Sequence, residues 1–490
     1  MKRSTAEEQG TPTSVIDRFI RALDDEATDA SHAVHSVMVL RHGHVIGEGW
    51  WHPFRAEDRH MLYSLSKSFT ATAVGLAVFE RRLTVSDRVV DLLPDDVPPD
   101  VGPKLAAMTV RDLLTMTTGH AVDTMPPHSA GPENWARAIL SLPVKYRPGT
   151  HFIYNSGATY LLSAILHRLT GERLLDYLTP RLLDPLGIVG ATWEQCPRGI
   201  DVGGWGMAIT TENIATFGQL MLRGGVWNDR QLVPADWVAD ATSAQVSSGD
   251  PTLPDDGTQG YGYQFWRNQH QTYRADGAFG QMSIVIPDHD VVVALTSGHT
   301  DAQRLRDITW AVLLPGLEAG RVGAARVGAA QVGAAQVGAA GSSTDGAFVA
   351  ALELPHPVGT AYSASDISGD WSLAVNPLGI DAIALDPTDG GVALRLRVGD
   401  AELVIDCGYR EWRRGSLVVG IGPGELARGG PIAASGAWVA DEYTAVVWLT
   451  ETPYAQIITL AFDRNHLEIV TRPNVSFADP VVVTRMSGHH

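Results

Sequence analysis

Apolar and polar residues follow two different patterns along the chain. The first 315 residues mix helical and strand periodicity, because some apolar residues recur every three or four positions and others alternate. The pattern predicts helices over 14–27, 64–79, 109–114, 158–170 and 211–223, and strands over 37–41, 44–48, 260–266, 282–287 and 291–296. This part is therefore expected to contain a sheet accompanied by helices.

Strand patterns dominate from about residue 367 onward. The expected strands cover 392–398, 401–407, 416–420, 444–449, 456–462, 466–471 and 481–484. Short strands at this spacing are typical of a β-barrel or a β-sandwich. No set of residues in this part suggests catalysis.

A repetitive segment separates the two parts. Residues 321–340 are four copies of the pentapeptide [R/Q]-V-G-A-A. Such small residues at a five-residue period build neither an amphipathic helix nor a strand, which indicates a linker. We expect a first domain over 1–316, a linker over 317–345 and a β-rich domain over 346–490, with few contacts between the two domains.

Composition and charge exclude several classes of function. A chain of 490 residues with 44% hydrophobic and 19% charged residues is typical of a globular protein with more than one domain. The net charge of -18 argues against nucleic acid or an anionic membrane as a partner. The two cysteines, Cys196 and Cys407, have neither disulfide-framework nor metal-site spacing. The N-terminal residues lack a signal-peptide pattern, so a cytoplasmic location is expected.

The candidate chemistry lies at the start of the second predicted helix. Ser64 and Lys67 form an S-x-x-K pair, which places both side chains on one helix face. A buried lysine has a lowered pKa and can accept the serine proton. Only four of the 37 basic residues are lysines, although the motif alone is also compatible with chance.

Tyr154 is a second candidate. It lies between an Arg-Pro-Gly turn and the helix predicted over 158–170, where its phenol would face helix N-terminal N–H groups. Acid–base catalysis and a structural tyrosine are both compatible with this position.

An ordered set of segments, from YSLSKSFTATAVGL through LLTMTTGH, PGTHFIYNSG, DPLGI, GGWGM and GYGYQFW to DGAFGQ, resembles the beta-lactamase-related serine hydrolases. This family includes class C beta-lactamases, DD-peptidases, family VIII carboxylesterases and 6-aminohexanoate-dimer hydrolase. The likeness covers about residues 30–315 and is strongest toward the esterase and dimer-hydrolase branch. It implies an α/β sandwich, with an antiparallel sheet flanked by helices plus a helical subdomain. The C-terminal part resembles a lipocalin-like barrel.

The resemblance also implies roles for single residues. Ser64 would be the nucleophile, Lys67 its general base and Tyr154 the group that relays the proton to the leaving group. The backbone N–H groups of Ser64 and Ala278 would form the oxyanion hole. The implied substrate-binding residues are Asn155, Gly277, Trp205 and Tyr263. No cofactor or metal is implied.

Two motifs depart from the family pattern. The Y-x-N motif has Ser156 at its third position, with Asn155 in the middle. The motif on the edge strand reads Ala275-Asp276-Gly277, which lacks the cation that binds a beta-lactam carboxylate.

The sequence therefore predicts a serine hydrolase that acts through an acyl-enzyme on a small-molecule carboxylic ester or amide. The alternatives are an acyltransferase or peptide cyclase of the same fold, a weak beta-lactamase and a catalytically silent binding protein. No G-x-S-x-G sequence occurs, which argues against an α/β-hydrolase.

Overall fold

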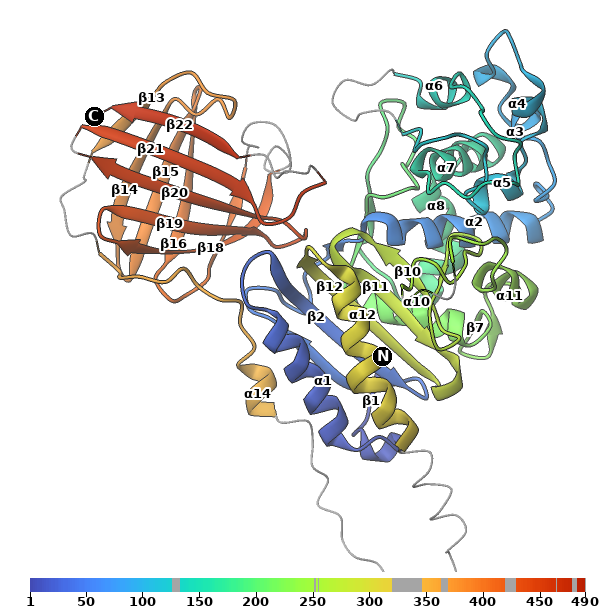
Figure 1. Ribbon diagram of the computed structural model, residues 1–490, viewed down its shortest axis with the longest axis horizontal. Coiled ribbons are helices and arrows are strands. Elements are labelled where there is room, and N and C mark those ends of the chain that lie inside the picture. The colour runs from blue at the N-terminus through green and yellow to red at the C-terminus, as the bar shows by residue number, and fades with distance from the viewer. Residues whose placement is uncertain are drawn as a thin grey trace, which may run out of the picture.

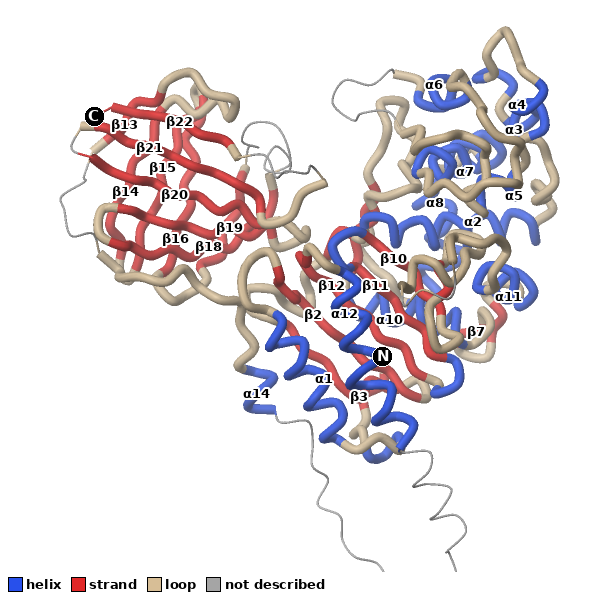
Figure 2. Tube along the Cα trace, viewed as in Figure 1, coloured by secondary structure: helices blue, strands red, loops and turns tan. Residues whose placement is uncertain are grey.

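The computed structural model describes residues 1–125, 133–250, 253, 255–319, 346–362, 369–418, 429–463, 465–477 and 483–489. An α/β core carries a helical region and a β-barrel, which lie on opposite sides of it in Figure 1. The colouring by secondary structure in Figure 2 separates the mostly helical region from the barrel. The pentapeptide repeats lie outside the described residues, and the domain boundaries stay a prediction.

A seven-stranded sheet forms the centre of the core, in the order β1-β3-β2-β12-β11-β10-β9. All neighbouring pairs are antiparallel except β1 with β3. Strand β12 is buried along its whole length, because helices cover both faces of the sheet. The strands are β1 (Lys2–Arg3), β2 (His32–Arg41), β3 (His44–Trp50), β9 (Trp266–Arg267), β10 (Tyr273–Gly277), β11 (Gln281–Ile286) and β12 (Val291–His299).

Helices α1 (Thr13–Glu26) and α12 (Ala302–Ile308) cover one face of this sheet (Figure 1), and α2 (Ser66–Phe79) and α10 (Thr211–Leu222) pack on the other side. The apolar stripe of α1 is buried, as its periodicity predicts. Helix α2 is buried on nearly all sides, because it lies between the sheet and the helical region. Within the described residues, no helix is long and apolar enough to cross a membrane.

The helical region packs over α2. Its longest member, α7 (Ser156–Thr170), contacts α2 and α5 and is buried along most of its length. The other helices are α3 (Val89–Leu92), α4 (Pro103–Ala107), α5 (Val110–Leu114), α6 (Trp135–Leu140), α8 (Leu174–Leu178), α9 (Asp184–Leu186) and α11 (Ala235–Thr242). Short strands accompany them: β4 (His60–Met61), β5 (Thr192–Trp193), β6 (Met207–Ile209), β7 (Val226–Trp227) and β8 (Arg230–Gln231).

The C-terminal part is a closed barrel of nine strands, because β16 and β18 also pair. Alternate residues point into an apolar interior, as in β16, where Leu403, Ile405 and Cys407 are buried. The barrel strands are β13 (Asp370–Leu373), β14 (Ala382–Thr388), β15 (Gly391–Val398), β16 (Ala401–Gly408), β18 (Gly430–Val439), β19 (Glu442–Leu449), β20 (Ala455–Asp463), β21 (His466–Pro473) and β22 (Thr484–His489), with β17 (Arg413–Leu417) paired beside β18. The expected barrel is confirmed.

The expectation of few contacts between the core and the barrel is wrong. Arg414 of β17 donates to both carboxylate oxygens of Asp58, at 2.8 and 2.7 Å. The Met61 amide donates to the Glu451 carbonyl oxygen at 2.8 Å. Trp448 of the barrel packs edge-on against the buried His35 ring. The composition of a linker therefore does not report how closely the domains that it joins pack.

Removing residues 346–490 is accordingly expected to destabilise the remaining chain. The truncation exposes Met61 and Tyr63, which are buried against the barrel, and leaves Asp58 without its arginine. We expect the truncated chain to melt at least about 5 °C below the full chain in differential scanning calorimetry. An unchanged melting temperature would show that the interface contributes nothing to stability.

The strand predicted over 260–266 is also not formed. Tyr261 makes isolated bridges to Val246 and Trp266, and Gln264 has a φ of 63°. The segment therefore folds back on itself, and only Trp266–Arg267 joins the sheet as β9. This fold positions Trp266 beside the candidate site.

Candidate active site

Ser64 lies in a 3-10 turn, Tyr63–Leu65, which leads directly into α2. The residue before it, Tyr63, has a φ of 49°, a left-handed conformation that costs a non-glycine residue on the order of 1 kcal/mol or more. Strand β10 approaches this turn closely, because a Cβ atom at Gly277 would collide with the Leu62 carbonyl oxygen. The glycine therefore allows β10 and the Ser64 turn to lie side by side.

Lys67 lies one helical turn beyond Ser64, and its side chain is 1% exposed. Its Nζ atom lies 3.0 Å from Ser64 Oγ, 3.2 Å from Ser156 Oγ and 2.7 Å from the Gly204 carbonyl oxygen. A neutral amine has two N–H groups and one lone pair. If the two N–H groups bind Ser156 and Gly204, the lone pair points at the Ser64 hydroxyl.

Burial lowers the pKa of Lys67 to about 7, although the Asp123 carboxylate opposes this shift. Asp123 also accepts hydrogen bonds from the Ser156 and Gly157 amides at the start of α7, at 3.0 and 3.4 Å. A large fraction of Lys67 is therefore neutral near pH 7, which a general base requires.

Tyr154 faces the same atoms from the loop before α7. Its side chain is within hydrogen-bonding reach of Ser64, and its ring lies 4.8 Å from Lys67 Nζ. Burial raises the pKa of Tyr154 far above its usual value, and the hydrogen bond to Ser64 only partly offsets this. The two neighbours thus have pKa values shifted in opposite directions, so Lys67 suits the role of base and Tyr154 that of acid.

The Tyr154 ring is held by an aromatic side chain that the sequence patterns did not single out. Trp266 of β9 stacks on it with the ring centroids 5.6 Å apart and an interplanar angle of 21°. Trp266 lies within the aromatic segment 260–266, but its role became apparent only because that segment folds back.

Ala278 lies directly after β10 and borders the Ser64 turn. The residue that follows it, Phe279, has a φ of 62°. Each residue of the predicted oxyanion hole therefore has one neighbour with a left-handed backbone conformation, Tyr63 before Ser64 and Phe279 after Ala278. The Phe279 and Tyr63 rings contact each other edge-on, with centroids 5.7 Å apart. This contact holds together the two chain segments that carry Ser64 and Ala278.

Two barrel residues contact these same rings. Tyr454 meets Tyr63 and Phe279 at centroid distances of 6.3 and 5.7 Å, and Phe477 meets them at 5.7 and 4.8 Å. Tyr454 is buried, whereas Phe477 is 71% exposed. The barrel therefore contributes to the surroundings of Ser64, although no motif in it suggested such a role.

A pocket of about 240 Å³ lies between the barrel and the helical region. Its wall includes Met61, three residues before Ser64, together with Glu194 and Gly206 on one side and Glu451 and Thr452 on the other. Ser64, Lys67 and Tyr154 are not among the residues that line this pocket.

Asn155 does not join this group. It is fully buried, and its side-chain oxygen accepts hydrogen bonds from the Thr124 amide at 3.1 Å and the Thr124 hydroxyl at 2.9 Å. The same oxygen lies 3.3 Å from the Ala158 amide, so Asn155 acts as the N-cap of α7. The side chain that reaches Lys67 is that of Ser156 instead.

The two aromatic residues predicted to bind substrate lie in different surroundings. Trp205 is partly buried next to Gly204, and its indole N–H donates to Glu194 at 3.3 Å. Tyr263 is 2% exposed, packs on Trp237 and accepts a hydrogen bond from Arg111 at 3.1 Å. Trp205 therefore adjoins the candidate site, and Tyr263 does not. Among the described residues, no three His, Cys, Asp or Glu side chains are placed to hold a metal ion.

The fold and the sequence together place the chain in one class of proteins. The profile of the Beta-lactamase family matches residues 16–315, and the chain belongs to this family. The chain is 27% identical over 305 residues to 6-aminohexanoate-dimer hydrolase of Paenarthrobacter ureafaciens, covering 57% of this chain and 74% of the relative. It is 25% identical over 196 residues to lovastatin esterase of Penicillium rubens, covering 35% of this chain and 48% of that relative.

One similar solved structure spans both parts of the molecule. The crystal structure of SurE with D-Leu has a TM-score of 0.50 and 19% sequence identity, and the match covers 89% of this chain and 97% of that chain. At this identity the likeness concerns the fold alone. A beta-lactamase-type core followed by a second domain is therefore an arrangement shared with another protein.

Proposed function

We propose that this protein is a serine hydrolase that cleaves carboxylic esters or amides through an acyl-enzyme on Ser64. The observation that carries the proposal is the buried Lys67 amine, 3.0 Å from the Ser64 hydroxyl, with a pKa lowered to about 7. The names of the two relatives, a dimer hydrolase and an esterase, support hydrolysis of an acyl bond.

In this mechanism Lys67 removes the proton of Ser64 as its oxygen attacks the substrate carbonyl carbon. The negative charge on the carbonyl oxygen is stabilised by the N–H groups of Ser64 and Ala278. The bond to the leaving group breaks as Tyr154 donates its phenolic proton to the leaving atom. The proton held by Lys67 then returns to the Tyr154 oxygen.

The second half of the cycle uses the same groups. Water attacks the acyl-enzyme, Lys67 accepts the proton of the water, and the proton passes to Ser64 Oγ as the acyl group leaves. Base and acid thus return to their starting protonation states.

The pH dependence of acylation tests the assignment of the base. The reactive form has a neutral Lys67, so the rate is expected to rise about tenfold from pH 6 to pH 8 around a pKa of about 7. Because the pKa of Tyr154 is raised, the phenol keeps its proton across this range. The measurement is the rate of covalent labelling by a fluorophosphonate between pH 5 and 9.

Mass spectrometry of the labelled protein should locate one adduct on Ser64. A catalytically silent binding protein would not be labelled, and an adduct on another serine would contradict the proposed nucleophile. A labelling rate that is constant from pH 6 to 8 would contradict the role of Lys67.

A further inference from the structure

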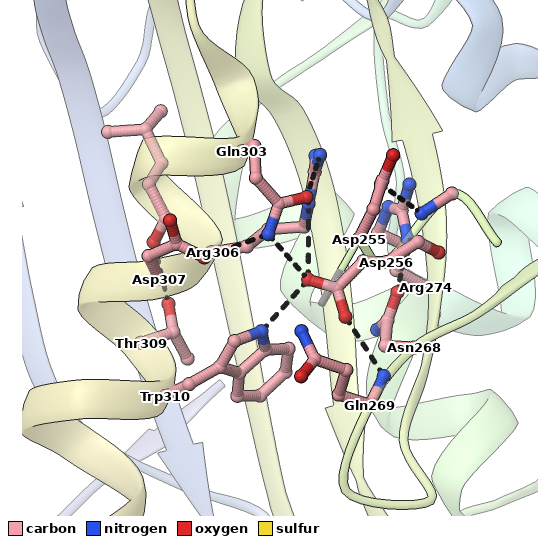
Figure 3. Close-up of polar contacts among 12 residues, drawn as sticks. Asp255, Asp256, Asn268, Gln269, Arg274, Gln303, Arg306, Asp307, Thr309 and Trp310 are labelled. Atoms are coloured by element: carbon pink, nitrogen blue, oxygen red, sulfur yellow. Dashed lines mark hydrogen bonds and ion pairs between the residues drawn. The ribbon is translucent and has the colours of Figure 1, made fainter. Parts of the chain in front are cut away.

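The polar network behind β10 is not used by the proposed mechanism. Figure 3 shows its centre, where Asp256 accepts hydrogen bonds from Trp310, Gln303 and the Gln269 amide at 2.9, 3.1 and 2.9 Å. Arg306 of α12 forms an ion pair with Asp256 at 3.4 Å. Burial disfavours the Asp256 carboxylate, but these hydrogen bonds hold its pKa below the usual value.

The network continues from Arg306 to the edge of the candidate site. The Arg274 side chain, which is 3% exposed, donates from Nε to Asp276 Oδ1 at 2.7 Å. Arg306 lies 3.7 Å from the same Asp276 oxygen. Arg274 also donates to the Asn268 side chain and to the Asp256 carbonyl oxygen. Two arginines and two carboxylates thus form a group without net charge.

Asp276 is the member of this network that lies nearest to the reacting groups. It lies on β10 directly before Gly277, the last residue of that strand, and its charge raises the pKa of Tyr154 in addition to the effect of burial. Trp266 contacts both Arg274, whose guanidinium carbon lies 5.4 Å from the indole centroid, and the Tyr154 ring. The Asp276 carboxylate is therefore close enough to Tyr154 to act on it electrostatically, and Tyr154 is the residue that protonates the leaving group in the proposed mechanism.

One oxygen of Asp276 remains available. Both arginine contacts end on Oδ1, and the side chain is 23% exposed. Within the described residues, Oδ2 accepts no hydrogen bond. A carboxylate that is anchored through one oxygen presents the other as a fixed hydrogen-bond acceptor.

A buried ion-pair network is weak evidence for a stabilising role, since apolar residues of similar volume often stabilise a protein as well. The network has a clearer consequence for ligand binding. Arg274 and Arg306 hold the Asp276 carboxylate in place, so that position 276 offers a negatively charged hydrogen-bond acceptor to a ligand. A basic side chain at position 276 would offer a hydrogen-bond donor instead, and an apolar side chain would offer neither.

We propose that Asp276 determines specificity by selecting substrates whose leaving group carries a protonated amine and by excluding those that carry a carboxylate there. The inference rests on the proposed hydrolase function and deepens it. The amine would donate to Asp276 Oδ2, whereas a carboxylate would meet a like charge in a partly desolvated place.

The test uses the full-length protein and three butyrate esters that differ only at the end of the alcohol. The alcohols are 4-(dimethylamino)butan-1-ol, which is protonated at pH 7, its neutral carbon analogue 5-methylhexan-1-ol, and 5-hydroxypentanoate. Release of butyrate gives kcat/KM for each ester. For each variant, kcat/KM for the cationic ester is divided by kcat/KM for the anionic ester. A loss of activity that affects all substrates equally therefore cancels in this ratio.

The protein is expected to hydrolyse the cationic ester at least about tenfold better than the anionic ester. In Asp276→Asn this preference should reverse, because Arg274 and Arg306 lose a carboxylate and the network acquires a positive charge. The matched control is Asp290→Asn. Asp290 is similarly exposed and also paired with an arginine, Arg223, but it lies at the opposite end of β11. In Asp290→Asn, the ratio of kcat/KM for the cationic ester to kcat/KM for the anionic ester should equal that of the unchanged protein.

Each remaining outcome has a definite meaning. A ratio near one in the unchanged protein, with the neutral ester hydrolysed, overturns the role of Asp276 and leaves the hydrolase proposal standing. A preference for the cation that persists in Asp276→Asn also overturns it. If none of the esters is hydrolysed and Ser64 is not labelled, both proposals fail.

Discussion

Ser64→Ala is expected to reduce ester turnover by at least about 10⁴-fold, because in the proposed mechanism the hydroxyl carries the covalent step and no other group replaces it. The substitution removes one oxygen atom from a turn held by its neighbours and by β10, so the fold should persist. Turnover of a chromogenic ester and near-UV circular dichroism measure the two effects.

Ser66→Ala is the matched control for this experiment. Ser66 lies two residues away, and its hydroxyl accepts a hydrogen bond from the Met207 amide at 3.2 Å without contacting Lys67. We expect its activity to stay within about threefold of the unchanged protein. If Ser64→Ala keeps more than about a hundredth of the rate, another residue is the nucleophile.

Lys67→Met and Tyr154→Phe are each expected to lower kcat by a factor of about 10² to 10⁴. Methionine retains most of the volume of the buried lysine, and phenylalanine retains the ring that stacks on Trp266. Because in the proposed mechanism one proton passes between the two groups, removing either interrupts the same step. The double variant should therefore lose much less activity than the product of the two single losses.

The measurement is a double-mutant cycle on kcat with one ester substrate. Lys104→Met, on the surface helix α4, serves as the control for the loss of a lysine. Two losses that multiply independently would show that the groups act in separate steps. A Tyr154→Phe variant with nearly full activity would make Tyr154 a structural residue, and the leaving group would take its proton from elsewhere.

The amphipathic patterns predicted the principal elements well. The helix predicted over 14–27 is α1, and the hairpin predicted over 37–48 is β2 and β3. Of the barrel strands, β13, β14 and β18 were missed. The strand predicted over 481–484 shares only Thr484 with β22, and residues 481–482 lie outside the described residues. In β18 the residues from Ile432 to Trp438 are all buried, so no alternation marks the strand, and small residues replace the β-branched ones that favour strands.

The candidate site likewise contains some residues that sequence patterns identified and others that they did not. Ser64 and Lys67 are three residues apart on one chain segment, so local geometry alone brings them together and the sequence is sufficient to find them. Tyr154 was selected as a candidate because a loop-to-helix junction has a recognisable sequence pattern, and the structure places it beside Lys67. The structure places Asn155 at the N-cap of α7, and an asparagine before a helix serves as an N-cap just as readily as a ligand contact.

These sequence patterns could not predict contacts between residues that are distant in the sequence. The approach of Trp266 to Tyr154, of Tyr454 and Phe477 to Tyr63, and of Arg306 to Asp276 joins elements that lie about 30 to more than 400 residues apart. No periodicity or motif encodes such distances, because they result from how the sheet, the helices and the barrel pack. The sequence thus indicated the candidate nucleophile, its candidate base and most of the secondary structure, whereas the surroundings that lower the pKa of Lys67 and raise that of Tyr154 follow from tertiary packing.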